Sequence, residues 1–389
     1  MDFKYYLPTK VLFGCDKLEQ LHQQKLPGRK ALIVTTIGNS MVKYGQLNKV
    51  QHQLDLSGTE YVVFKGIGGN PEREQIMKAV NLFHEGGCDF IIGLGGGSCI
   101  DASKAIAISA SNGGDIWDYI YGDSDMRKPV KNKMVPLVAI PTTAGTGSEV
   151  DQWMVISDRL TKEKVGFGYS KSFPMMAVVD PTLTESIPPH LTAYQGMDAF
   201  FHSTEGYISA EANPLTDILA LKVIQLISDN LPKCVKNGKD RKARMKVSLA
   251  STLSGIVLAN TSMTAEHGIE DGLSGFFPDV PHGAGLIAIS EAYYTKIAAK
   301  GHSEERLIEM AKAMGVENAE SGYDFITSLK KLLSDCNVDD IKLSDYGVEP
   351  WAFPQIISNA KKNAASEFLA EKQLLTDEEC ISILQTSFK

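Results

Sequence analysis

The feature that most constrains the fold is a change of pattern near the middle of the chain. In the first half, short continuous apolar runs rich in β-branched residues alternate with helical stretches. The runs are Ala31–Thr36, Tyr61–Phe64, Phe90–Leu94, Val135–Ile140 and Met176–Val179. Continuous apolar runs of this length are typical of strands covered on both faces. Because the intervening segments, such as Glu72–His84, have helical periodicity, the pattern predicts a doubly wound parallel sheet.

After Pro188 and Pro189 the periodic stretches are all helical, and no run there is typical of a strand. The expected helices are Thr216–Asn230, Arg241–Asn260, Ser303–Met314, Tyr323–Asp335, Trp351–Asn363 and Thr376–Thr386. The sequence therefore predicts two domains. Residues 1–189 should form a Rossmann-like α/β domain that binds a dinucleotide, and residues 190–389 an all-helical domain.

Composition excludes several functional classes. The chain has 389 residues, 43% of them hydrophobic and 22% charged, which is typical of a globular protein. Its net charge is −8 and its lysines and arginines are scattered, which argues against nucleic-acid or anionic-membrane partners. Six distant cysteines form no C-x-x-C pair and suit a reducing cytoplasm. With no signal-peptide pattern or apolar run of about 18 residues, we expect a cytoplasmic protein.

A glycine-rich loop follows the third apolar run. Gly95, Gly96 and Gly97 lead into an expected helix that Ser98 and Asp101 should begin as a capping box. Glycines let backbone N–H groups approach an anion, and a helix N-terminus adds positive potential, so a pyrophosphate would fit there. Ser98 stands where the usual dinucleotide fingerprint has its third glycine. A tight turn packed on a neighbouring strand therefore remains an equally good interpretation.

A second loop of small residues follows the fourth apolar run. The segment Pro141–Glu149 has four hydroxyl side chains and two glycines at the end of an expected central strand. Ligands of open α/β sheets bind at the carboxyl ends of strands. Seen alone, this loop could be a surface turn, but two such loops on one sheet favour a bound ligand.

Histidines in the helical half indicate a possible metal site. Asp198 and His202 are spaced i, i+4, so a helix would place them on one face. With His267 and His282 they would offer one carboxylate and several imidazoles, which suits a divalent transition metal. An Asp-x-x-x-His pair is more often a simple helix-surface hydrogen bond, so the spacing alone is weak support. His190, beside two prolines, is interpreted as a linker residue.

Together these motifs resemble the iron-dependent (group III) alcohol dehydrogenases. The resemblance extends from about Leu7 to Gly283, whereas the last hundred residues resemble the family only in being helical. The motifs are Gly95–Lys104, Pro141–Glu149, Gly196–His202 and Pro281–Gly283. The resemblance implies a dehydroquinate synthase-like two-domain architecture with a nicotinamide cofactor and a divalent metal in the cleft between the domains.

The resemblance also implies roles for individual residues. The metal ligands would be Asp198, His202, His267 and His282. The pyrophosphate would contact Gly96, Gly97, Ser98 and Asp101, and the nicotinamide would lie near Thr142, Thr143 and Thr146. Further cofactor contacts would be Asn70 and Lys164, although Asn70-Pro71 is also a plain turn signal and Lys164 could be a solvated lysine.

Two departures from the family pattern affect these expectations. The family usually has a second histidine four residues after the third ligand, where this chain has Asp271. Asp271 could be a catalytic proton relay or a surface acid before Gly272, and both interpretations stay open. The family's NAD-preferring members often have an aspartate where Thr36 stands. Without that carboxylate the site could accept a 2′-phosphate, which slightly favours NADP over NAD.

The resemblance implies reversible hydride transfer between NAD(P)H and an aldehyde or primary alcohol. Fe²⁺ is the favoured ion, with Zn²⁺ and Mn²⁺ as alternatives, and a homodimer or larger homo-oligomer is expected. One alternative is a same-fold enzyme acting on an anionic or phosphorylated substrate, either a polyol-phosphate dehydrogenase or a cyclising lyase. It is disfavoured because such a site needs several lysines and arginines around the substrate, and the metal segment is expected to have none nearby. The other is a non-catalytic scaffold relative, prompted by the missing second histidine.

Overall fold

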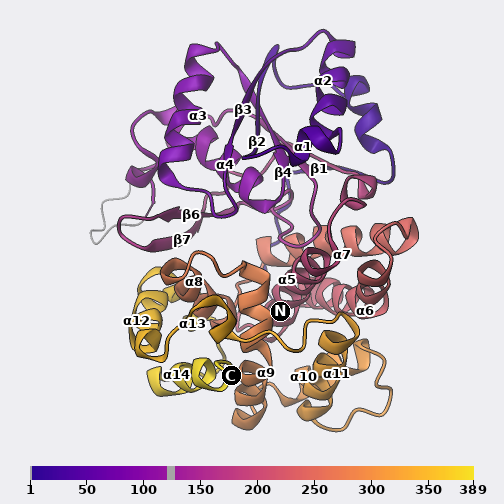
Figure 1. The fold of residues 1–389 in the computed structure, drawn as a ribbon, viewed down its shortest axis with the longest axis vertical. Coiled ribbons are helices and arrows are strands. Elements are labelled where there is room, and N and C mark those ends of the chain that lie inside the picture. The colour runs from indigo at the N-terminus through magenta and orange to yellow at the C-terminus, as the bar shows by residue number, and fades with distance from the viewer. Residues whose placement is uncertain (1, 121–127) are drawn as a thin grey trace. The chain divides into compact units, whose positions relative to one another are not determined.

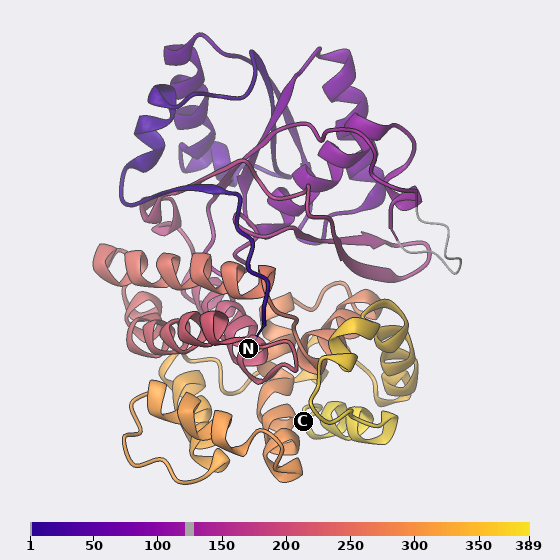
Figure 2. The same cartoon turned by 180° about the vertical axis from the view of Figure 1, so that it is seen from behind.

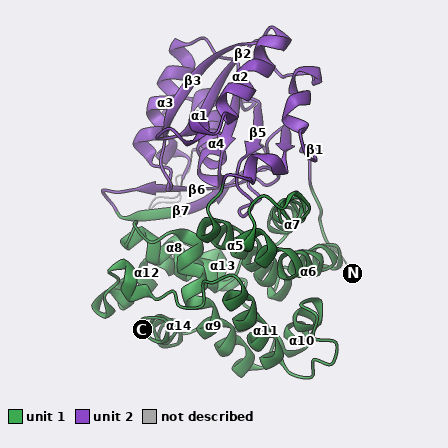
Figure 3. Cartoon of the chain, turned by 45° about the vertical axis from the view of Figure 1, so that its right-hand side comes forward, with its two compact units in different colours: residues 1–6, 162–164, 187–389 green, residues 7–161, 165–186 purple. Residues whose placement is uncertain are grey.

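A computed structural model of the chain describes residues 2–120 and 128–389. The chain forms two compact units, shown in different colours in Figure 3. The α/β unit comprises Leu7–Thr161 and Val165–Ser186. The helical unit comprises Met1–Tyr6, Lys162–Lys164 and Ile187–Lys389. Two short segments from the first half of the chain thus belong to the helical unit, a feature that the sequence pattern did not indicate.

The α/β unit is built on a parallel sheet, as predicted. In the part of the chain that the structure describes, this sheet has six strands in the order β1-β8-β5-β4-β2-β3, and every pairing is parallel. The strands are β1 (Lys10–Phe13), β2 (Lys30–Thr36), β3 (Glu60–Ile67), β4 (Phe90–Gly95), β5 (Leu137–Pro141) and β8 (Met176–Val179). A separate pair consists of β6 (Trp153–Asp158) and β7 (Glu163–Gly168). The strands β1, β6 and β7 were not predicted, although β6 begins with four apolar residues, Trp153–Ile156.

Helices cover both faces of the sheet (Figure 1), which is the physical reason for the continuous apolar strands. Ala31 and Ile33 of β2 belong to one core cluster with Leu47, whereas Leu32 belongs to the opposite cluster with Ile76. The helices of this unit are α1 (Ser40–Lys43), α2 (Gln46–Ser57), α3 (Arg73–Glu85) and α4 (Gly97–Asn112). Short 3₁₀ turns are η1 (Lys17–Gln23), η2 (Ile116–Asp118) and η3 (Pro181–Thr184).

In the helical unit, α6 and α7 pack along the buried helix α5 (Figure 2). The helices are α5 (Pro189–Ile208), α6 (Pro214–Lys236), α7 (Arg241–Ala259), α8 (Ala265–Phe276), α9 (His282–Lys300), α10 (Glu304–Ala313), α11 (Gly322–Asp335), α12 (Phe353–Asn363), α13 (Ala365–Leu369) and α14 (Asp377–Thr386), with 3₁₀ turns η4 (Leu343–Tyr346) and η5 (Pro350–Ala352). Residues 187–389, all of which are described, contain no strand, as predicted. Asn213 and Asp240 cap α6 and α7 through their side chains.

The interpretation of His190 as a linker residue is wrong. It lies in the first turn of α5, directly after Pro189. Proline suits the first position of a helix because its missing N–H has no intrahelical acceptor there. In the described ranges, no helix combines the length and the apolar character needed to span a bilayer.

Gly93 lies inside β4 where α4 packs closely on the sheet. A methyl group at this position would lie 2.8 Å from Ser103 Oγ, which itself donates a hydrogen bond to Cys99 O at 2.6 Å. Overpacking of this kind costs about 1–3 kcal/mol. Gly93→Ala should therefore lower the free energy of unfolding by that amount, measured by urea denaturation. Gly166→Ala is the matched control, because its methyl would meet only Val155 Cγ2 at 3.9 Å. An equal loss in both variants would contradict the packing argument.

Candidate metal centre and nucleotide loops

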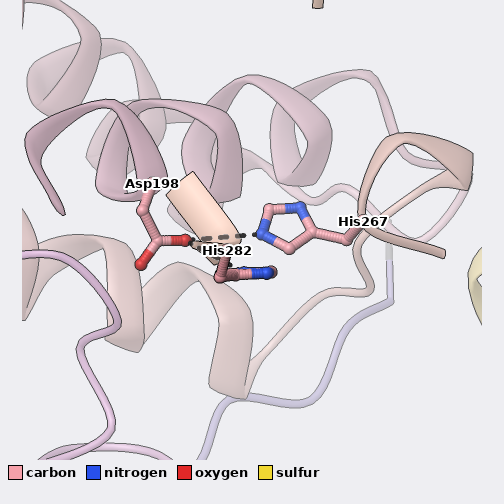
Figure 4. A group of neighbouring side chains, drawn as sticks. All are labelled: Asp198, His267 and His282. Atoms are coloured by element: carbon pink, nitrogen blue, oxygen red, sulfur yellow. Dashed lines mark ion pairs between the residues drawn. The ribbon is translucent and has the colours of Figure 1, made fainter. Parts of the chain in front are cut away.

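Three imidazoles surround one carboxylate oxygen in the interior of the helical unit. Asp198 Oδ1 lies 3.5 Å from His267 Nε2, 3.6 Å from His282 Nε2 and 3.7 Å from His202 Nδ1. Figure 4 shows Asp198, His267 and His282 pointing toward one another from α5, α8 and α9. His202 lies beside this group, with its ring stacked on that of His267 at a centroid distance of 4.5 Å. The folding of the chain thus gathers all four predicted ligands.

The spacing of these atoms fits a divalent metal ion. Ligands about 2.1 Å from a tetrahedral ion lie about 3.4 Å from one another, close to the separations around Asp198 Oδ1. Among the described residues, Asp198 Oδ1 and His267 Nε2 are buried and make no hydrogen bond. Buried polar atoms without a partner are costly, so both atoms point to a bound group. One carboxylate with imidazoles suits Fe²⁺, Zn²⁺ or Mn²⁺.

The imidazoles keep the Asp198 carboxylate charged. Burial on its own raises the pKa of Asp198, but His202, His267 and His282 outweigh it and hold that pKa well below the usual value. A carboxylate that stays ionised is the form that binds a metal.

A buried carboxylate behind His267 fixes the orientation of that ring. Glu205 Oε1 is hydrogen-bonded to His267 Nδ1, which leaves Nε2 to face Asp198. Glu205 Oε2 accepts hydrogen bonds from Thr264 N at 2.9 Å, Thr264 Oγ1 at 3.0 Å and His267 N at 3.3 Å. Glu205 therefore also satisfies backbone N–H groups in the first turn of α8. Burial alone lowers the pKa of His267, but Glu205 and Asp198 raise it well above its usual value.

His282 has an equivalent partner in Glu270. Glu270 Oε2 is hydrogen-bonded to His282 Nδ1 and lies 3.3 Å from Lys164 Nζ. Burial on its own raises the pKa of Glu270, but His282 and Lys164 lower it to about 2. Carboxylates that accept from the outer nitrogen of a ligand histidine fix its tautomer and raise its basicity. Neither Glu205 nor Glu270 was assigned a role from the sequence.

A chain of hydroxyls leads from Glu205 to a second buried acid. Thr264 Oγ1 lies 3.0 Å from Glu205 Oε2 and 2.7 Å from Tyr293 Oη, which lies 2.6 Å from Glu371 Oε1. Tyr293 Oη donates to Glu371 Oε1, which also accepts from Ala265 N at 3.2 Å. Burial raises the pKa of Glu371 to about 7 and outweighs these hydrogen bonds, which lower it.

In the α/β unit, the residues expected to bind a nucleotide follow neighbouring parallel strands. Thr36 ends β2, Asn70 follows β3, Gly96 follows β4 and Thr142 follows β5. Parallel strands end at the same edge of a sheet, so these residues share one edge. Because β3 and β4 lie on opposite sides of β2, this edge includes the topological switch point at which open α/β sheets bind ligands.

The two small-residue loops approach each other too closely for side chains at two glycines. A Cβ atom at Gly97 would lie 2.5 Å from Thr146 Cγ2, and one at Gly96 would lie 3.1 Å from Thr143 Cγ2. These glycines therefore allow the loop after β4 to pack against the loop after β5.

The expected capping box is wrong. The helix α4 begins at Gly97 with Gly96 as its N-cap, and no side chain caps it. Ser98 Oγ instead donates to Gly69 O at 2.5 Å, and the carboxylate of Asp101 is bound elsewhere. A glycine N-cap leaves backbone N–H groups of the first turn without a side-chain acceptor, which suits the binding of an external anion.

Asp101 belongs to a buried polar network. Its oxygens accept from Ser148 Oγ at 2.5 Å and Val155 N at 3.0 Å. Lys104 is fully buried and donates to Ser148 Oγ at 2.8 Å and Asp151 Oδ1 at 2.7 Å. The network joins α4 to the loop after β5, so it holds the two loops together. The expected contact of Asp101 with a pyrophosphate stays a prediction.

Comparison with known proteins identifies the family. The family model described as iron-containing alcohol dehydrogenase matches residues 8–181, and the model for the C-terminal part of the Fe-containing family matches residues 192–388. The chain belongs to the iron-containing alcohol dehydrogenase family. The family resemblance inferred from the motifs is confirmed. The chain is thus an oxidoreductase that acts on CH–OH groups.

Individual relatives agree with this membership. The chain is 32% identical over 370 residues to the 1,3-propanediol dehydrogenase of Klebsiella pneumoniae, covering 93% of each protein. It is 34% identical to the NAD-dependent methanol dehydrogenase of Bacillus methanolicus, covering 70% of each. It superimposes with a TM-score of 0.94 and 31% identity on an archaeal halo-thermophilic alcohol dehydrogenase from a Red Sea brine pool, covering 100% of this chain and 99% of that one.

This iron-containing alcohol dehydrogenase differs from the sequence expectations around Asp271. Asp271 is no surface acid, since it is buried within α8 with Oδ1 2.8 Å from Lys164 Nζ. Lys164 is no solvated lysine, since it is buried on β7 and also donates to Ser274 Oγ at 2.7 Å. Burial alone lowers the pKa of Lys164, but Asp271 and Glu270 raise it above its usual value. The expectation that no lysine lies near the metal segment was also wrong, because Lys164 belongs to the helical unit and lies beside α8.

Glu205, which was assigned no role from the sequence, lies at a helical spacing from two predicted ligands. Asp198, His202 and Glu205 are spaced i, i+4, i+7, which places all three on one face of α5. Glu270 and Lys164 had no such signal, because their contact joins two elements that are distant in the sequence.

The buried carboxyl of Glu371 predicts that the free energy of unfolding depends on pH. Its folded pKa of about 7 lies above that of an unfolded glutamate. The group's stabilising effect is therefore full below pH about 4.5 and is lost as the pH rises through 7. Glu371→Gln does not titrate, so its unfolding free energy relative to wild type should rise by on the order of 3 kcal/mol between pH 4.5 and 7.5. Urea denaturation across this range tests the prediction.

Glu379→Gln is the control of opposite sign. Burial on its own raises the pKa of Glu379, but the hydrogen bonds from Thr376 N and Lys300 together lower it. Its ionised form stabilises the fold, so this substitution should become more harmful as the pH rises. A pH-independent difference for Glu371→Gln would contradict the argument.

Proposed function

We propose that this chain is a NAD(P)-dependent, divalent-metal-dependent alcohol dehydrogenase that interconverts a small aldehyde and its primary alcohol. The proposal rests on the gathering of imidazole nitrogens around Asp198 Oδ1 at 3.5–3.7 Å, the spacing of metal ligands. The ligands would be Asp198, His202, His267 and His282. Fe²⁺ is favoured because the chain belongs to the iron-containing alcohol dehydrogenase family, with Zn²⁺ and Mn²⁺ as alternatives that the same ligands suit.

When bound, the ion would supply a Lewis acid for the substrate oxygen, and the nicotinamide would supply or accept the hydride. The chain's own residues prepare the site for both groups. Glu205 and Glu270 accept the Nδ1 protons of His267 and His282, so both Nε2 atoms face Asp198. Asp271 stands in place of the family's usual second histidine and is the candidate acid–base residue.

Nucleotide binding would use the two loops of the α/β unit. The N–H groups of Gly96, Gly97 and Ser98 at the start of α4 would hold the pyrophosphate. The residues proposed beside the nicotinamide are Thr142, Thr143 and Thr146, with Asn70 as a further contact. Lys164 is withdrawn from the cofactor contacts, because its ammonium already binds Asp271, Ser274 and Glu270.

The choice of nucleotide would depend on the end of β2. Thr36 offers no carboxylate for the ribose 2′-hydroxyl and no charge against a 2′-phosphate. The relative from Bacillus methanolicus is named as NAD-dependent. We therefore propose that both nucleotides are accepted, with NADPH slightly favoured.

The first test is oxidation of NADH and NADPH with a panel of neutral, hydroxylated and anionic aldehydes. Metal-stripped protein should gain activity when Fe²⁺, Zn²⁺ or Mn²⁺ is restored under anaerobic conditions. His267→Ala removes one ligand and should lower kcat/KM by at least about 100-fold, since loss of even outer partners of a metal costs 10–100-fold. Its circular dichroism should be unchanged.

His190→Ala is the matched control, because His190 is an exposed histidine of the same unit. It should keep full activity. Metal-independent turnover, or normal turnover of His267→Ala, would overturn the ligand assignment.

Thr36→Asp tests the nucleotide preference. A carboxylate at the end of β2 would bond a ribose hydroxyl and repel a 2′-phosphate. The ratio of kcat/KM for NADH to that for NADPH should rise by about tenfold or more. Thr36→Asn has the same size without the charge and should change this ratio much less. If Thr36→Asp and Thr36→Asn had equal NADH-to-NADPH ratios of kcat/KM, the ribose 2′ position would not lie beside residue 36.

A further inference from the structure

A second group of possible cation ligands lies next to the proposed metal site. Glu270, Asp271 and His282 each offer one atom, and these three atoms lie within 4.8 Å of one another. Glu270 Oε1 is fully buried and makes no hydrogen bond among the residues that the structure describes. This carboxylate therefore has room for another partner.

The ammonium of Lys164 occupies this group. Its Nζ lies 2.7 Å from Ser274 Oγ, 2.8 Å from Asp271 Oδ1 and 3.3 Å from Glu270 Oε2. Three N–H donors thus face three oxygen acceptors. His282 Nδ1 lies only 3.5 Å from the same Nζ and is hydrogen-bonded to the same Glu270 oxygen.

The charges explain why a cation belongs there. Glu270 and Asp271 are adjacent and buried, and two buried carboxylates without a positive partner are costly. Lys164 neutralises one of the two charges. A divalent ion could neutralise both and would use the same oxygens, so the ammonium and a metal ion compete for one position.

We infer that Lys164 fills, as a built-in ammonium, a second cation site formed by oxygens of Glu270, Asp271 and Ser274 beside His282, and so restricts the centre to one metal ion. The inference rests on the proposed function, because the second site adjoins His282 of the proposed metal site. Glu270 is then a positioning residue for His282. The contact of Glu270 with Lys164 keeps Glu270 from becoming a metal ligand.

The test measures the number of Co²⁺ ions bound per chain. Metal-free protein is equilibrated with excess Co²⁺ under anaerobic conditions, and bound cobalt is counted by mass spectrometry and by visible absorption. Wild type should bind one ion. Lys164→Met and Lys164→Gln remove the charge and should bind two. The glutamine keeps side-chain donors for Asp271 and Ser274, so it serves if the methionine variant does not fold.

Three further variants locate the second ion. Lys164→Arg keeps the positive charge and should bind one Co²⁺. The double variant Lys164→Gln with Glu270→Gln loses a ligand of the second site and should return from two ions to one. Lys300→Met removes another paired lysine of the helical unit, 2.9 Å from Glu379, and should stay at one. A general loss of structure would lower the metal count, whereas the proposal requires a rise.

The outcomes separate this inference from the proposed function. If wild type binds no Co²⁺, the proposed metal site fails and the second site fails with it. If wild type binds one ion and both neutral variants also bind one, only the inference about Lys164 is overturned. Two ions in wild type, or two in the double variant, would overturn it as well.

Discussion

The carboxylate of Asp198 is buried among three imidazole rings, and the charges around it constrain how the helical unit packs. The helices α5, α8 and α9 each contribute at least one of these side chains. Buried carboxylates are tolerated only when positive groups or hydrogen-bond donors surround them. Glu205 and Glu270 meet this condition by accepting from His267 and His282, and in doing so they aim both rings at Asp198.

In the α/β unit, the candidate binding site depends on the backbone geometry of two loops. Its parallel strands end at one edge, where glycines let two loops approach within a distance that a side chain would block. Asp101 and Lys104 then connect α4 to the second loop through buried hydrogen bonds. These loops present backbone N–H groups and hydroxyls, which suit an anionic nucleotide, whereas the helical unit presents the candidate ligands for a metal.

A charged cluster lies beside the candidate metal ligands of this iron-containing alcohol dehydrogenase. Asp271 replaces the family's usual second histidine, and Glu270 and Asp271 share the ammonium of Lys164. A lysine that is held by two carboxylates has little capacity left for an anionic substrate. This argues against the alternative of a phosphorylated substrate, even though a lysine does lie close to the metal segment.

The sequence by itself determined the fold class, the family and the candidate ligands, because apolar periodicity, glycine loops and helical spacing such as Asp198 and His202 are local properties. The helical spacing of Glu205, one turn after His202 in α5, also indicated a place beside the candidate ligands, although no role was assigned to it from the sequence. The sequence analysis misjudged the capping box of Ser98 and Asp101 and the place of His190, and it did not show that Lys164 is buried, since local patterns do not show which polar group a side chain will meet. Only the tertiary structure decided those partners. Pairs such as Lys164 with Asp271 join elements far apart in the sequence, and burial away from water makes each such pairing obligatory.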